Sequence, residues 1–167
     1  MRKLRFGWAM LIVVFGAISC GIYSPYGAST AGAETFSVAP FEVIDPLASA
    51  TAALVLAEGL RDRVQRQTTL ALRETGGDCQ FAADIVKYEV RPVNVQGDET
   101  AATNRLTIAV DLTYSNLKAP DQDFRRTFSR FADYPSASDL FSLEEELLEE
   151  ISDQISQDVF NASLGNW

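Results

Sequence analysis

Three segments after residue 80 alternate between apolar and polar residues, which is the pattern of a strand with one buried face. The clearest spans residues 105–117, and its apolar positions are Leu106, Ile108, Val110, Leu112 and Tyr114. Residues 81–95 and 123–134 are predicted to form its neighbours, joined to it by polar turns over 96–103 and 118–122. Because strands joined by short connections run antiparallel, these three segments predict the centre of an antiparallel sheet.

Two longer segments repeat apolar residues every three or four positions, which is the spacing of one helix face. The first predicts a helix over 46–67, with Asp45 as N-cap and Pro46 in the first turn. The second predicts a helix over 142–163, where Ser142 and Glu145 match a capping box. The expected buried residues are Leu47, Ala50, Leu54, Ala57, Leu60 and Val64 in the first, and Leu143, Leu147, Ile151, Ile155 and Val159 in the second.

Shorter strands are predicted over 35–42 and 68–73, on either side of the first helix. Pro40 has no N–H, so the first of these is expected to lie at a sheet edge or to end there. The order strand, helix, four strands, helix predicts an α+β fold. We expect a two-layer sandwich in which two helices cover one face of a mainly antiparallel sheet of four to five strands. Residues 35–167 are expected to form a single domain.

The first twenty residues differ in composition from the rest. Basic residues within 1–5 precede an apolar run over 6–18 that is too short to span a bilayer. The run ends in Ala17-Ile18-Ser19-Cys20, which resembles a lipobox, where a cysteine after small residues is acylated and becomes the new N-terminus. We therefore predict a lipoprotein signal peptide over 1–19 and a diacylglycerol and N-acyl lipid on Cys20. Residues 20–34, rich in Gly, Ser and Ala, are expected to form a tether.

Gly21 points to the outer membrane, because the best-known sorting rule retains lipoproteins with Asp at this position in the inner membrane. Two or three acyl chains make a firm anchor. The domain is therefore expected in the periplasm, anchored to the outer membrane. The alternative is an ordinary signal peptide, cut near Ala17 or Ser19 or after Ala31-Gly32-Ala33.

The composition excludes several function classes. The chain has 14 basic residues, 23 acidic residues and no histidine, for a formal net charge of −9. Such an acidic chain is a poor candidate for nucleic-acid binding, and it lacks the commonest general base and metal ligand. It has no P-loop, dinucleotide fingerprint, zinc spacing or GxSxG elbow. We therefore predict no catalytic residue, no metal and no cofactor apart from the covalent lipid, and expect Cys79 to be a small buried residue in or beside a strand.

A binding surface on the strands remains as the candidate functional feature. Guanidinium and ammonium groups suit phosphate, and an aromatic side chain adds contact with acyl chains or a partner. The candidate residues for contact with phosphate groups, acyl chains or a partner are Arg105, Lys118, Arg125, Arg126, Arg130 and Phe131. The alternative is that these basic residues form cross-strand salt bridges with acidic neighbours such as Asp84, Asp111 and Asp123.

Several short stretches, in one order along the chain, carry a family resemblance. They are Cys20-Gly21-Ile22-Tyr23-Ser24, Gly27-Ala28-Ser29, Ser37-Val38-Ala39-Pro40-Phe41-Glu42, Asn104-Arg105-Leu106-Thr107-Ile108, Ser129-Arg130-Phe131-Ala132-Asp133-Tyr134, Phe160-Asn161-Ala162 and Asn166-Trp167. With these stretches the chain resembles the LptE family of lipopolysaccharide-assembly lipoproteins.

The resemblance implies a two-layer α+β sandwich that sits as a plug in a large outer-membrane β-barrel, LptD, in a 1:1 complex. It also implies a role in lipopolysaccharide transport and insertion into the outer membrane, in assembly of the barrel, and in binding lipopolysaccharide through basic residues. Only the Cys20 anchor is carried over to a specific residue. The alternative is a lipoprotein adaptor or pilotin for another envelope secretion machine.

Overall fold

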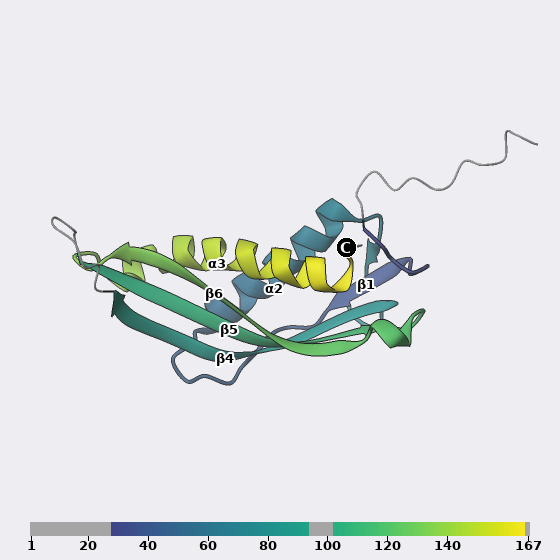
Figure 1. Cartoon of the computed structure of the whole chain (residues 1–167), viewed down its shortest axis with the longest axis horizontal. Coiled ribbons are helices and arrows are strands. Elements are labelled where there is room, and N and C mark those ends of the chain that lie inside the picture. The colour runs from purple at the N-terminus through teal and green to yellow at the C-terminus, as the bar shows by residue number, and fades with distance from the viewer. Residues whose placement is uncertain (1–27, 94–101, 166–167) are drawn as a thin grey trace, which may run out of the picture.

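The computed structural model describes residues 28–93 and 102–165 of the 167-residue chain. The predicted signal peptide, Cys20 and most of the loop predicted over 96–103 lie outside these residues. Two helices cover one face of a mixed sheet, which confirms the predicted α+β sandwich (Figure 1). The helices are α2 (Ala50–Gln67) and α3 (Leu140–Ser163).

Three long antiparallel strands form most of the sheet: β4 (Cys79–Val93), β5 (Thr103–Asn116) and β6 (Phe124–Pro135). Three short strands pair in parallel at the other side: β1 (Thr35–Val38), β2 (Glu42–Val43) and β3 (Ala71–Leu72). The strand order is β3-β1-β4-β5-β6, and β2 also pairs with β4. A 3₁₀ turn, η1 (Pro120–Gln122), lies between β5 and β6.

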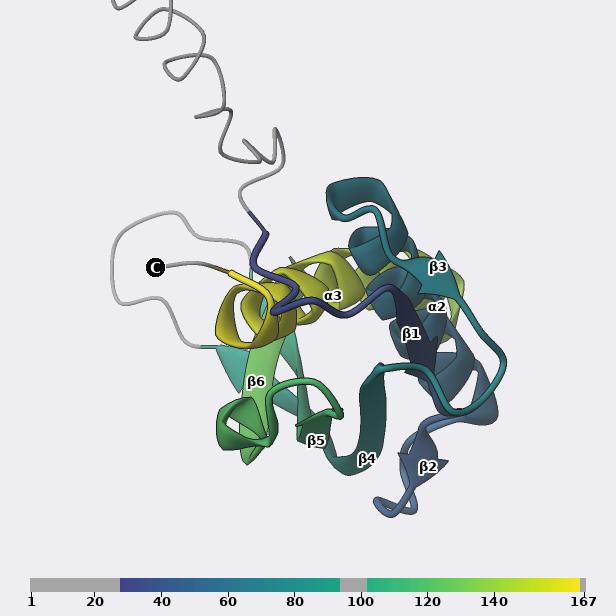
Figure 2. The ribbon, with the colours of Figure 1, turned by 90° about the vertical axis from the view of Figure 1, so that its right-hand side faces the viewer.

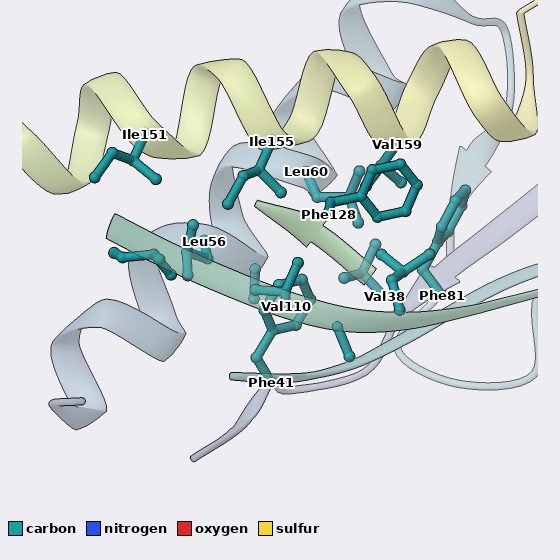
Figure 3. Packing of buried hydrophobic residues seen from close by; sticks show 14 of the residues in the cluster. Val38, Phe41, Leu56, Leu60, Phe81, Val110, Phe128, Ile151, Ile155 and Val159 are labelled. Carbon is teal, nitrogen blue, oxygen red and sulfur yellow. The ribbon is translucent and has the colours of Figure 1, made fainter. Parts of the chain in front are cut away.

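The core lies between the helices and the inner face of the sheet (Figure 2). The predicted apolar side of β5 is confirmed, because Leu106, Ile108, Val110, Leu112 and Tyr114 are all fully buried. Figure 3 shows Ile151, Ile155 and Val159 of α3 pointing toward this sheet face. The stripe predicted for the second helix is thus confirmed at those three positions and at Leu147, while Leu143 is half-buried.

The helices run side by side in the same direction, and their contacts join corresponding turns. Ser49 donates to Glu144 Oε1 (3.3 Å) near the start of both helices, and Arg63 donates to Gln157 Oε1 (2.8 Å) near their ends. Between these points Gly59 of α2 faces Ser152 of α3. Helix α3 packs mainly on β6, whereas α2 packs near β1 and β2.

The predicted start of the first helix was wrong. The helix begins at Ala50, and Ser49 is its N-cap, accepting a hydrogen bond from the Ala52 N–H (3.0 Å). Asp45 has another role, because its carboxylate accepts from the Leu47 N–H (2.9 Å) and, across the fold, from the Tyr88 N–H (3.0 Å). The buried face of the helix is Ala52, Ala53, Leu56, Ala57, Leu60 and Val64, so Leu47, Ala50 and Leu54 of the predicted stripe are exposed instead.

Other boundaries also differ from the prediction, by one or two residues in the three long strands. Helix α3 begins at Leu140 with Asp139 as N-cap, and the Ser142 hydroxyl donates to the Asp139 carbonyl, so the capping box was wrong. The strand predicted over 35–42 ends at Val38, consistent with the expected effect of Pro40, and the chain then pairs again through β2. The strand predicted over 68–73 is reduced to β3.

Candidate interaction surface

The sheet register divides the six predicted contact residues among three places. Residues of β5 that alternate with its buried positions face away from the helices, and Arg105 is one of them. Arg105 pairs with Asp133, Thr107 with Phe131, and Thr113 with Arg125. The outer face of the sheet therefore carries Arg105, Arg125 and Phe131.

Arg105 and Phe131 form one unit on this face. The Arg105 guanidinium binds the Asp133 carboxylate with two hydrogen bonds of 2.7 and 2.8 Å, which lowers the pKa of Asp133. It also lies 3.7 Å above the centre of the Phe131 ring, a cation–π contact. Phe131 remains 45% exposed. In this unit the Phe131 ring is exposed, and Asp133 already neutralises the charge of the neighbouring Arg105.

The remaining basic groups of the outer face are also paired. Arg125 contacts Asp111 at 2.8 Å and Asp84 at 3.9 Å. Lys87 and Arg91 both bind Glu89, at 2.8 and 2.6 Å, and hydrogen bonds from these two cations lower the pKa of Glu89. These are further ion pairs among neighbouring side chains of the sheet. They include the salt bridges with Asp84 and Asp111 that the alternative prediction expected. The face is a network of opposite charges rather than a basic patch.

The other three predicted contacts lie elsewhere. Arg126 and Arg130 share the helix-covered side of β6, since their β5 partners Leu112 and Ile108 are buried there. Arg130 binds Asp158 of α3 through two hydrogen bonds of 2.6 and 2.8 Å. Lys118 lies in the β5–β6 connection, 3.6 Å from Asp78.

Arg126 is the exception among the predicted basic contacts. Its guanidinium lies 5.6 Å from the centre of the Phe124 ring, and no carboxylate within the described ranges forms an ion pair with it. The six predicted residues thus do not form one site. Five of them already have partners inside the molecule, whereas Arg126 is exposed at an edge of the sheet and has no ion pair within the part of the chain that the structure describes.

An exposed apolar patch was missed by sequence reasoning. It consists of Val43, Ile44, Leu47 and Leu54, exposed by 40, 60, 72 and 60%. The two hydrogen bonds to Asp45 fix the segment that carries Ile44 and Leu47, so these side chains are held in solvent. Beside the patch is a groove of about 300 Å³ lined by residues of β2, α2 and the segment before β2. The sequence signal for this patch is the spacing of Leu47 and Leu54, which also predicts a buried helix face.

A larger groove of about 520 Å³ follows the line between α2 and α3. Its charged lining is mainly acidic, from Glu58, Asp62, Glu149 and Asp153, with Arg66 as the basic residue. In the part of the chain that the structure describes, no group of three or more metal-ligating side chains is close enough to hold an ion. Across residues 28–93 and 102–165, no helix combines the length and apolarity needed to cross a membrane.

Polar groups at the start of β4 stabilise the fold. Cys79 is fully buried in β4, as predicted, with its sulfur 3.4 Å from the Tyr114 hydroxyl, and burial raises the pKa of its thiol. Asp78 accepts hydrogen bonds from the Glu34 N–H and from both the N–H and hydroxyl of Thr35. These bonds lower the pKa of Asp78 to about 2. Asp78 thereby fastens the segment before β1 to the start of β4.

Comparisons with solved structures find low sequence identity. The minor lipoprotein of Acinetobacter baumannii is 13% identical, with a TM-score of 0.49 over 77% of this chain and 90% of that one. The rare lipoprotein B of Shewanella oneidensis is 16% identical, with a TM-score of 0.45 over 75% of this chain and 92% of that one. A search of curated proteins finds no match.

A family model gives the decisive comparison. The LptE model, described as lipopolysaccharide-assembly, matches residues 33–163. The match runs from just before β1 to the last residue of α3 and so includes every helix and strand of the fold. It confirms the family resemblance carried by the short sequence stretches, and the chain belongs to the LptE family of lipopolysaccharide-assembly proteins.

Proposed function

We propose that this protein is a lipid-anchored outer-membrane subunit that acts, without catalysis, as plug and assembly partner of a large LptD-type β-barrel. The observation that carries the proposal is the family match over the whole sandwich. In this role the protein contributes to the transport of lipopolysaccharide and its insertion into the outer membrane. Cys20, with its diacylglycerol and N-acyl lipid, is the proposed anchor, and residues 20–34 are the proposed tether to the domain.

The surface chemistry supports a protein partner more than broad binding to phosphates. Arg105, Arg125 and Arg130 each bind a carboxylate at less than 3 Å. A lipopolysaccharide phosphate would have to compete with these carboxylates for the same guanidinium groups. The exposed patch around Leu47 and the half-exposed Phe131 offer apolar contact instead, as protein interfaces do. We therefore propose that the predicted contact set serves mainly the barrel and not the lipid.

The partner is tested by purifying the protein in mild detergent from its own outer membranes and identifying the co-purifying chains by mass spectrometry. A large β-barrel in 1:1 ratio is the expected result. A secretin or another machine in its place would support the adaptor function and refute the plug. Purification without any partner would also refute it.

The anchor is tested by Cys20→Ala, which is expected to leave the folded protein soluble in the periplasm. Cys79→Ala is the matched control, because Cys79 is a buried residue of β4 and its removal leaves the lipidation site intact. If Cys20→Ala still fractionates with membranes as the unmodified sequence does, the lipid anchor is wrong.

A further inference from the structure

The backbone of β6 directs alternate hydrogen-bonding groups away from the sheet. Ser136, just beyond the strand, donates its N–H to the Ala102 carbonyl of the β5 side (2.9 Å). Because bonded pairs recur every two residues in an antiparallel ladder, the even-numbered residues of β6 bond to β5. The odd-numbered residues point their N–H and C=O groups to the free side of the sheet. Five of them are Arg125, Thr127, Ser129, Phe131 and Asp133, and the sixth, Pro135 at the end of the strand, has no N–H.

These outward groups have no partner among the described residues. β6 is the last strand in the sheet order, and its odd-numbered residues from Arg125 to Asp133 form no backbone hydrogen bond outside the sheet, whereas the Pro135 carbonyl accepts one from the Ser138 N–H (3.0 Å). The five residues also include no proline. From Arg125 to Asp133 the open edge is about 27 Å long, at about 3.4 Å per residue. An edge of this length can pair with a complete additional strand.

β4 lies at the opposite side of the three long strands and also has a stretch without a neighbouring strand. Most outward N–H groups of this stretch are unavailable, so we call it the closed edge. Leu117 donates to the Asp78 carbonyl (2.9 Å), and the register after the irregularity at Ile85/Lys87 turns Tyr88, Val90 and Pro92 away from β5. The Tyr88 N–H is bound by Asp45, and Pro92 has no N–H. Two of the three outward positions are thus unable to donate to an incoming strand. Among the described residues the two edges therefore differ, and β6 is left open from Arg125 to Asp133.

Charge indicates what kind of strand fits the open edge. β6 carries three arginines in a chain of formal net charge −9. Arg125 and Arg130 have carboxylate partners, whereas no carboxylate of residues 28–93 or 102–165 pairs with Arg126. An acidic side chain on an added strand, next to Arg126 on the same face, would supply the missing partner. A second copy of β6 would bring another basic strand to this position.

We propose that β6 is a docking edge that pairs its outward backbone groups with a strand of another polypeptide, which places an acidic residue beside Arg126. Main-chain hydrogen bonds supply the affinity, and the charge supplies the selectivity. The inference deepens the proposed function by naming where a partner binds. It rests on the protein having a protein partner, whichever envelope machine that partner belongs to.

The test uses a photo-crosslinking phenylalanine analogue in place of Phe131, in the full chain produced in its own cells. Phe131 is suitable because it is aromatic, half-exposed and on the open edge. The same analogue in place of Val90 probes the closed edge of β4. One adduct with another polypeptide is expected from Phe131 and none from Val90.

Two substitutions then test the mode of contact, each with a matched control. Ser129→Pro removes one outward N–H without removing a bond to β5, and Val90→Pro removes one from the closed edge. Arg126→Glu reverses the uncompensated charge, and Arg66→Glu reverses an exposed arginine of α2 that likewise has no ion pair among the described residues. Ser129→Pro and Arg126→Glu are each expected to reduce the adduct at least tenfold, with the controls near the unmodified level. Urea unfolding confirms that each variant is folded.

The outcomes separate this inference from the proposed function. No adduct from Phe131, an adduct only with a second copy of this chain, or an adduct indifferent to Ser129→Pro and Arg126→Glu overturns the docking edge. If a barrel still co-purifies in that case, the proposed function stands. An adduct with the expected sensitivity but with a chain other than a barrel supports the docking edge and refutes the plug function.

Discussion

The contact between the two helices offers a quantitative test of the packing, because it depends on one glycine. A Cβ atom added at Gly59 would lie 2.1 Å from Ser152 Oγ and 3.3 Å from Ser152 Cβ. Ser152 is buried, and its hydroxyl donates to the Val55 carbonyl across the helix pair (3.1 Å). Glycine is therefore required here by the close approach of α3 and not by an unusual backbone conformation.

Gly59→Ala is expected to lower the free energy of unfolding despite its better helix propensity. Alanine gains about 1 kcal/mol over glycine within a helix. Displacing the Ser152 hydroxyl from Val55 costs about 1 kcal/mol. Forcing the added methyl between the packed helices costs about 1 to 3 kcal/mol. The net loss is about 1 to 3 kcal/mol, measured by urea denaturation followed by circular dichroism.

A double-mutant cycle isolates the contact. Ser152→Gly removes both clashing atoms, and alone it costs about 2 kcal/mol through helix propensity and the lost hydrogen bond. In the double variant the methyl group added at position 59 has space, so the total loss is about 1 kcal/mol and the two changes couple by at least about 2 kcal/mol. Thr51→Ala, at an exposed position of α2, is the control and is expected to change stability by less than about 0.5 kcal/mol. Additive effects of Gly59→Ala and Ser152→Gly would refute the proposed packing.

Three further predictions concern single side chains. The pKa of Asp78 is lowered to about 2 in the folded state, so its contribution to stability is present above its ordinary pKa of 3.8 and is lost between about pH 4 and pH 2. In urea unfolding at both pH values, Asp78→Asn is expected to lose less stability on acidification than the unmodified protein. The Cys79 thiol is expected to react with a thiol reagent only after unfolding, because it is fully buried with a raised pKa, and rapid reaction of the native protein would contradict this. Ile155→Ala is expected to lower the free energy of unfolding by about 2 to 5 kcal/mol in the same denaturation assay, because it opens a cavity between α3 and the sheet. Leu47→Ala, in the exposed patch, is expected to be nearly neutral. Equal losses for the two variants would contradict the assigned core.

Hydrophobic periodicity was enough to identify the two helices, the three long strands and the sandwich class. It succeeded where one face of an element is buried along most of its length, as in β5 from Leu106 to Tyr114 and in α3 from Leu147 to Val159. Burial imposes the period of two or of about 3.6 directly on these residues, so the local pattern carries the information. The prediction that Cys79 is buried in a strand rested instead on the general behaviour of a free cysteine as a small apolar residue, and it is confirmed.

Helix starts and the contact residues depended on partners distant in the sequence. Asp45-Pro46 has the local form of a helix start, but the Asp45 carboxylate binds the Tyr88 N–H, and Ser49 begins the helix instead. The predicted basic contacts were separated for a similar reason, because Arg105 binds Asp133 and Arg130 binds Asp158 across 28 residues each. A side chain's available charge depends on which groups the fold brings to it.

The sequence by itself determined the layers of this protein, the elements within them and the family to which it belongs, because burial patterns and short stretches of sequence are local. The tertiary structure alone decided which sheet edge is open and that Arg126, of the three arginines of β6, has no ion pair within the described residues. The closed edge of β4 requires Asp45 to lie beside Tyr88, and the open edge of β6 requires that no described element lie beside it. Both follow from strand order and register, which are set by long-range pairing.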